Sequence, residues 1–119
     1  MDRRILIIDN DNGCLEMMTE VFQNEGFDIK GLLGTANIFD EIDLFKPHLV
    51  IIDYILEGVN GGELCHQLKT NEHTCHLPVV IISAHSKVIH SLGNYKSDHI
   101  LAKPFDIFEL RDIVTELIF

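Results

Sequence analysis

Residues 5–9 read Ile-Leu-Ile-Ile-Asp, residues 49–53 read Leu-Val-Ile-Ile-Asp, and residues 79–83 read Val-Val-Ile-Ile-Ser. Each stretch is an unbroken apolar run that ends in a polar side chain. Runs of this kind, rich in β-branched residues, are typical of strands buried on both faces of a parallel sheet. Two weaker runs, residues 27–33 and 99–102, predict two further strands.

Stretches with helical spacing of apolar residues separate these strands. The first carries its apolar residues between positions 17 and 22 and is capped by Asn10 or Asp11. Thr35 is the predicted cap of a second helix that ends before Pro47. Shorter helices are predicted over 61–68 and 86–92, and a last one begins at Asp106. The alternation predicts an α/β fold, a doubly wound five-stranded parallel sheet with helices on both faces.

The composition limits the possible functions. The chain has 119 residues, 19 acidic and 9 basic side chains, and a formal net charge of −10. This length fits a single domain. The acid excess argues against a protein that mainly binds nucleic acid or an anionic membrane. No secretory signal or membrane-length apolar run is visible, and the three cysteines lack a disulfide-framework spacing. We therefore expect a cytoplasmic protein.

Polar side chains follow four of the predicted strands. They are Asp9-Asn10-Asp11, Asp53, Ser83 and Lys103-Pro104. Each alone is common as a helix cap, a turn residue or a solvated side chain. Because parallel strands end at one edge of a sheet, the four together predict a shared crevice there. Clustered carboxylates with a lysine and a hydroxyl suit Mg²⁺-assisted phosphoryl transfer, with Asp53 as the nucleophile.

Four segments in this order also carry a family resemblance. They are residues 5–11, residues 49–53 through Asn60-Gly61, residues 79–84, and Lys103-Pro104-Phe105. Together they resemble the receiver domain of bacterial response regulators over essentially the whole chain. The resemblance implies a flavodoxin-like sheet of strand order 2-1-3-4-5. It also implies that residues 1–119 form one receiver domain without an output domain, a phosphorelay switch rather than a turnover enzyme.

The resemblance implies roles for single residues. Asp53 would accept a phosphoryl group from a sensor histidine kinase or a phosphotransfer protein. Ser83 occupies the position at which the family has its switch hydroxyl, and Lys103 occupies the position of the family's characteristic lysine. Mg²⁺ or Mn²⁺ would be held by the side chains of Asp9, Asn10 and Asp53 and by the backbone carbonyl of Ile55.

The sequence departs from the family pattern at functional positions. Asn10 stands where the family usually has a second acid, which should weaken metal binding. Ile100 stands at the aromatic switch position and has no hydroxyl. The positions that tune phosphoryl hydrolysis are occupied by Ile55 and His85. We expect the apolar Ile55 to slow the attack of water.

The resemblance also indicates how a signal would leave the domain. Phosphorylation would reshape a face formed by residues 86–94 and 106–117. The output would lie in a separate protein, or in a longer parent of this chain. We expect a monomer or a weak dimer.

Three alternatives remain open at this point. A degenerate receiver would bind partners without being phosphorylated. A haloacid-dehalogenase-type phosphatase would use Asp9 as its nucleophile, although Gly13 does not fit that motif and Asp53 would have no role. The cysteines and histidines at 65–66 and 73–76 could in principle hold zinc, but their spacing matches no paired zinc motif.

Overall fold

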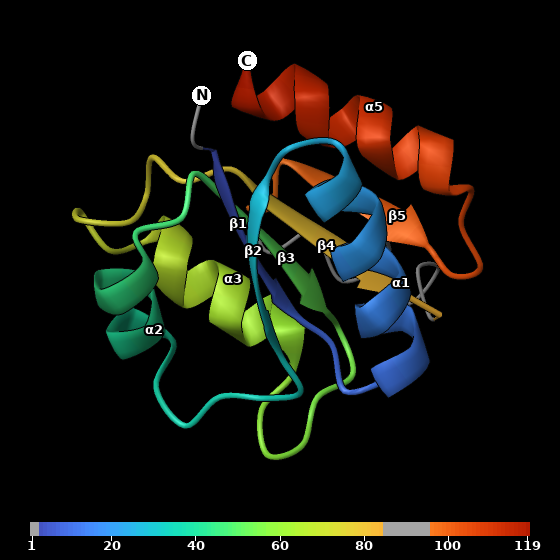
Figure 1. Cartoon of the computed structure of the whole chain (residues 1–119). Coiled ribbons are helices and arrows are strands. Elements are labelled where there is room, and N and C mark those ends of the chain that lie inside the picture. The colour runs from blue at the N-terminus through green and yellow to red at the C-terminus, as the bar shows by residue number, and fades with distance from the viewer. Residues whose placement is uncertain (1–2, 85–95) are drawn as a thin grey trace.

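Five parallel strands form the centre of the computed structural model, which describes residues 3–84 and 96–119 (Figure 1). The strand order is β2-β1-β3-β4-β5, which confirms the predicted sheet and its topology. The strands are β1 (Arg4–Ile8), β2 (Asp28–Leu32), β3 (Leu49–Asp53), β4 (Val79–Ser83) and β5 (His99–Ala102). Their bounds lie within two residues of the predicted runs.

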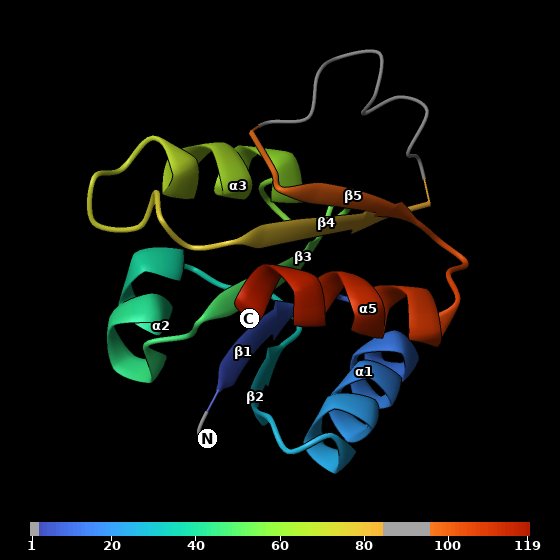
Figure 2. The same cartoon turned by 90° about the horizontal axis from the view of Figure 1, so that it is seen from above.

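Helices cover both faces of the sheet. They are α1 (Asn12–Asn24), α2 (Ile38–Phe45), α3 (Gly61–Lys69) and α5 (Ile107–Ile118). Helices α1 and α5 pack on one face, and α2 and α3 pack on the other (Figures 1 and 2). The helix predicted over 86–92 and the tuning residue His85 lie outside the described residues. Within the described ranges, no helix is long and apolar enough to cross a bilayer.

Side-chain caps fix where the helices begin. Asp11 caps α1 by accepting a hydrogen bond from the Cys14 backbone N–H at 3.2 Å. The predicted Thr35 cap of α2 is wrong, because the Asn37 side chain accepts from the backbone N–H groups of the first turn. Thr35 instead accepts from the Asn37 backbone N–H at 3.2 Å and so shapes the turn before the helix. Asparagine is a strong cap, and it stands next to the first helical residue.

Successive residues of each inner strand face opposite helix layers. Ile5 and Ile7 pack with α1 and α5, whereas Leu6 and Ile8 pack with α2 and α3. All four side chains are fully buried. Each buried aliphatic side chain of this size contributes about 1.5–3 kcal/mol to the hydrophobic driving force. The unbroken apolar runs therefore supply two separate cores, one on each side of the sheet.

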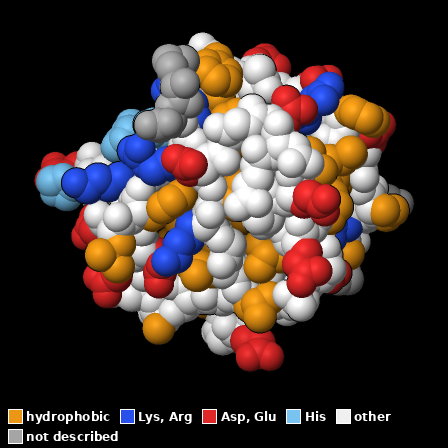
Figure 3. All heavy atoms as spheres, in the orientation of Figure 1, with side chains coloured by type: hydrophobic (Ala, Val, Ile, Leu, Met, Phe, Trp, Pro, Cys, Tyr) orange, Lys and Arg blue, Asp and Glu red, His pale blue; other side chains and the backbone are white. Residues whose placement is uncertain are grey.

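The N-terminal edge of the sheet carries an unusual histidine contact. The His48 backbone N–H donates to the Arg4 carbonyl at 2.7 Å, and the Arg4 backbone N–H donates to His48 Nδ1 at 2.9 Å. Partial burial, followed by the positive charges of Arg4 and Arg3, lowers the pKa of His48. Lys, Arg and His side chains gather on the surface beside the N-terminus in Figure 3. Protonated Nδ1 could not accept this hydrogen bond.

We predict that His48 makes stability fall in mild acid. A histidine whose pKa is lowered by folding binds its proton more readily in the unfolded chain, so its stabilisation holds above the unfolded value of about 6.5 and is lost below it. His48→Asn keeps an acceptor near the Nδ1 position but does not titrate. Urea unfolding from pH 7.5 to 5 should show the wild type losing up to about 1 kcal/mol more than the variant, the worth of one hydrogen bond. Parallel pH profiles for the two proteins would contradict this role.

Candidate functional site

Three charged side chains meet at the C-terminal edge of the sheet. Lys103 Nζ lies 3.1 Å from Asp53 Oδ2, 3.1 Å from Asp9 Oδ2 and 3.3 Å from Asp9 Oδ1. Asp9 and Asp53 continue the alternation of β1 and β3 on the α1–α5 side, and Lys103 continues that of β5. Side chains two residues apart on a strand share a face, so the three project from neighbouring strands into one layer. The structure thus brings together three of the predicted site residues.

Asp9 is the most deeply buried of the three charged residues. Its side chain is completely buried, and its Oδ1 accepts a hydrogen bond from the Asp11 backbone N–H at 2.9 Å. Oδ2 faces Lys103 Nζ but has no hydrogen bond of acceptable geometry. Burial alone would raise the pKa of Asp9, but hydrogen bonds from Asp53, the Asp11 backbone and Lys103 together hold it below the ordinary value. Asp9 is therefore the member of the carboxyl pair that ionises first as pH rises.

The pKa of Asp53 is shifted in the opposite direction to that of Asp9. Its residue is only 4% exposed, and burial together with neighbouring Asp9 raises the pKa of Asp53 to about 6. The Lys103 ammonium acts against this rise. Burial disfavours the lysine's charge, but the two carboxylates outweigh it and raise the pKa of Lys103. Asp53 therefore ionises at a higher pH than Asp9 does, and Lys103 keeps its charge between the two.

Gly61 positions the backbone around Asp53. Its N–H donates to the Tyr54 carbonyl at 2.7 Å as helix α3 begins. A Cβ atom at Gly61 would overlap the Asp53 carbonyl oxygen and would lie 2.7 Å from Ile52 Cγ2. Only glycine allows α3 to start this close to the end of β3. The sequence motif contained Gly61, but its steric role emerges only when the helix is placed against the strand.

The predicted switch residues are Ser83, at the end of β4, and Ile100, within β5. Ser83 is fully buried, and its backbone carbonyl accepts a hydrogen bond from the Lys103 N–H at 2.8 Å. By the alternation of β4, its side chain belongs to the α2–α3 layer rather than to the layer of the charged groups. Ile100 is half-buried against the same layer and pairs in register with Ile81. Ser83 and Ile100 thus share a face that Lys103 does not.

The remaining predicted ligands are more exposed. Asn10 is exposed, and Ile55 is 46% exposed while its N–H lies 3.4 Å from Asp53 Oδ1. Asp11 uses Oδ1 to cap α1. The carboxyl pair fits a hard cation nonetheless, because Asp9 Oδ2 is buried without a hydrogen bond and a cation would favour the ionised form of Asp53.

Zinc does not fit. In the part of the chain that the structure describes, no three His, Cys, Asp or Glu side chains are arranged to hold a metal ion. Cys65 is instead a core residue, and burial raises the pKa of its thiol to about 12.

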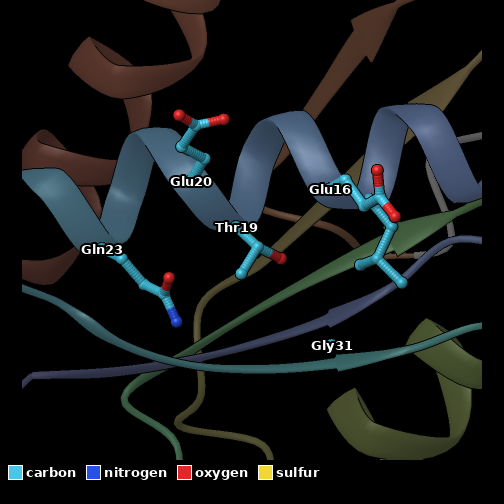
Figure 4. A pocket seen from close by; sticks show the side chains of 6 residues that line it. Glu16, Thr19, Glu20, Gln23 and Gly31 are labelled. Atoms are coloured by element: carbon cyan, nitrogen blue, oxygen red, sulfur yellow. The ribbon is translucent and has the colours of Figure 1, made fainter.

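Several surface grooves border helix α1. One, of about 510 Å³, lies beside Lys103 and is lined by Asp11, Gly13, Cys14, Met17, Ala84, Lys103, Pro104 and Phe105. Sequence reasoning missed this groove and Cys14, whose place in the first turn after Asp11 was the available signal. Burial, followed by nearby Asp9, raises the pKa of Cys14 to about 12. Figure 4 shows another groove, of about 330 Å³, between α1 and Gly31 of β2, which none of the residues Asp9, Asp53 and Lys103 lines.

We predict that Asp53→Asn stabilises the metal-free protein. A carboxyl group whose pKa is raised by folding binds its proton more tightly in the folded state, so its ionisation destabilises the fold as pH rises from about 4 to about 6. The variant should exceed the wild type by on the order of 1–3 kcal/mol at pH 7.5, and the difference should shrink towards pH 4. Urea unfolding in EDTA measures both. A variant that is less stable at pH 7.5 would contradict this assignment.

Comparison with known proteins agrees with this geometry. A family model described as response regulator receiver domain matches residues 5–115. The DNA-binding response regulator MtrA of Mycobacterium tuberculosis is 30% identical over 112 residues, which cover 92% of this chain and 48% of MtrA. Sporulation initiation phosphotransferase F of Bacillus subtilis is 30% identical over 122 residues, which cover 96% of this chain and 92% of that protein.

A solved structure shows the same fold. The response regulator TrrA of Thermotoga maritima, crystallised in complex with Mg²⁺-BeF, superposes with a TM-score of 0.85 at 23% identity, over 97% of this chain and 98% of that one. The chain spans about half the length of MtrA but nearly all of phosphotransferase F. With the family model matching almost its whole length, the chain belongs to the family of response regulator receiver domains, the phosphorylation-based switches of two-component systems.

Proposed function

We propose that Asp53 is the phospho-acceptor of this receiver domain, and that a phosphohistidine of a sensor kinase or phosphotransfer protein is the donor. The observation that supports this is the contact of one Lys103 ammonium with two buried carboxylates, Asp9 and Asp53. Asp9 has no exposed surface, whereas Asp53 keeps a small exposed fraction. An attacking group must reach phosphorus, so Asp53 is the better nucleophile of the two.

The transfer needs little chemistry from the protein beyond placement and charge. An ionised Asp53 oxygen forms the new P–O bond while the P–N bond of the donor phosphohistidine breaks, and the imidazole keeps that electron pair. Lys103 offsets negative charge that builds on the phosphoryl oxygens. The groove beside Lys103 is where we place the approaching donor surface, because it borders the charged groups directly.

Mg²⁺, or Mn²⁺, is the proposed cofactor. Asp9, Asp53, the Asn10 side-chain oxygen and the Ile55 carbonyl would hold it, and the ion would neutralise charge on the carboxylates and the phosphoryl group. Mg²⁺ keeps several waters, so two carboxylates are a sufficient anchor. Asn10 supplies one negative charge fewer than an acid would, which favours a weak site. TrrA, by its description, was solved with Mg²⁺-BeF.

The output of the switch lies beyond this domain. We propose that residues 1–119 form a single receiver domain whose surface over residues 86–94 and 106–117 contacts an output partner. The first of these segments lies outside the described residues. MtrA is by name a DNA-binding regulator, and this chain matches only about half of it. With a net charge of −10, this chain is not itself proposed to bind DNA or a membrane.

We predict that acetyl phosphate with Mg²⁺ adds one phosphoryl group to the wild type, measured by intact mass. Asp53→Asn should take up none, because it lacks the nucleophile, and EDTA should abolish labelling of the wild type. Asp112→Asn, which changes an exposed carboxylate on α5, is the matched control and should label normally.

The same measurement separates the alternatives. Label that persists in Asp53→Asn but disappears in Asp9→Asn would favour a dehalogenase-type phosphatase. Folded wild-type protein that takes up no label at any Mg²⁺ concentration would favour a phosphorylation-independent binding module. Either result would overturn the proposal for Asp53.

We predict that Ile55→Asn shortens the lifetime of the phosphoryl group. Ile55 is half-exposed next to Asp53, where an apolar side chain cannot orient a water molecule for attack. An amide there can, and we expect a lifetime shorter by about tenfold, the scale on which one positioned hydrogen bond acts. Loss of label after removal of acetyl phosphate gives the lifetime. Ile55→Val is the control and should match the wild type, and equal lifetimes for all three proteins would exclude this role.

A further inference from the structure

A group of basic side chains lies at the end of the sheet opposite the charged site. We call it the basic edge, and its members are Arg3, Arg4, Lys46 and His48. The Arg4 Nε–H donates to the Lys46 carbonyl at 2.7 Å, and Arg4 and His48 exchange the two hydrogen bonds described above. Figure 3 shows Lys, Arg and His side chains gathered beside the N-terminus. The basic edge therefore joins the starts of β1 and β3 to the end of α2.

The backbone fixes this arrangement. Lys46 has a left-handed conformation, with φ of 54°, and its N–H donates to the Ile42 carbonyl at 2.7 Å to close helix α2. Its carbonyl is thereby turned towards Arg4. The Arg3 guanidinium carbon lies 5.1 Å from the centre of the Phe119 ring, a cation–π contact that holds the side chain. The basic groups are thus held together by contacts that do not neutralise them.

No carboxylate in the described part of the chain forms an ion pair with these basic side chains. Over residues 3–84 and 96–119, Lys69, Lys103 and Arg111 form ion pairs, whereas Arg3, Arg4 and Lys46 form none. Asp28 pairs in register with Arg4 on the neighbouring strand, yet makes no ion pair with it.

The surroundings of His48 show the same excess of positive charge. Its pKa is lowered first by partial burial and then by the positive charges of Arg4 and Arg3. An unpaired positive surface stands out in a chain with 19 acidic and 9 basic side chains.

We propose that the basic edge docks a short acidic segment of a partner protein. Complementary charge is the property that recommends this occupant, because Arg3, Arg4 and Lys46 lie together and none of them forms an ion pair within the described residues. A long polyanion such as DNA would extend beyond the edge onto a surface that carries the rest of the −10 charge and would be repelled there. Exposed charge pairs are individually weak, so the binding is weak and sensitive to salt.

A fluorescently labelled oligoglutamate peptide provides the test, with fluorescence anisotropy as the readout. The wild type should bind it at low ionic strength and release it as salt increases. Lys46→Gln removes one charge and leaves the Lys46 carbonyl in place, so the edge keeps its hydrogen bonds. It should weaken binding several-fold, and Arg4→Gln combined with Lys46→Gln should weaken it on the order of tenfold.

Lys30→Gln combined with Lys96→Gln is the matched control. Both lysines are exposed and lie outside the basic edge, so this double variant makes the same change in net charge. It should bind the peptide about as the wild type does. Equal weakening by the two double variants would show a net-charge effect and overturn the proposal.

Two further outcomes would also overturn it. They are no binding of the peptide by the wild type, and tighter binding of a short DNA duplex than of the peptide. Labelling of Asp53 by acetyl phosphate should be unchanged in Lys46→Gln, which keeps this test separate from the proposed phosphoryl transfer.

Discussion

One ammonium group between two buried carboxylates is the interaction on which the site depends. Asp9 and Asp53 would repel each other in a desolvated layer, and Lys103 lies 3.1 Å from an oxygen of each. The lysine reaches them because β1, β3 and β5 end at the same edge and turn alternate side chains to the same layer. The contact between Lys103 and the two carboxylates therefore depends on the order and the direction of the strands.

Much of the fold was predictable because its strongest signals are local. The runs beginning at Ile5, Leu49 and Val79 are buried on both faces, and few other structures accept such continuous apolar sequence. The Thr35 cap was wrong for an equally local reason. Two side chains that can both cap lie two residues apart, and hydrophobic spacing does not decide between them.

The site was predictable only in part. That Asp9, Asp53 and Lys103 converge follows from the shared direction of the strands. The layer occupied by Ser83, the contact of Gly61 with Asp53 and the groove beside Cys14 depend instead on how distant segments pack. The same holds at the opposite edge, where Arg4 and His48 are 44 residues apart in sequence. A contact between residues so far apart cannot be predicted from the spacing of residue types along the sequence.

The alternation of β3, β4 and β5 has a mechanical consequence. The sheet separates two layers: Asp53 and Lys103 continue the α1–α5 layer, whereas Ile100 packs in the α2–α3 layer. A change of charge at Asp53 therefore acts first in the α1–α5 layer. A group bound to Asp53 would have to extend past the C-terminal edge of the sheet to contact a side chain of the α2–α3 layer. The length of such a group, as well as its charge, therefore decides whether a change at Asp53 affects the α2–α3 layer.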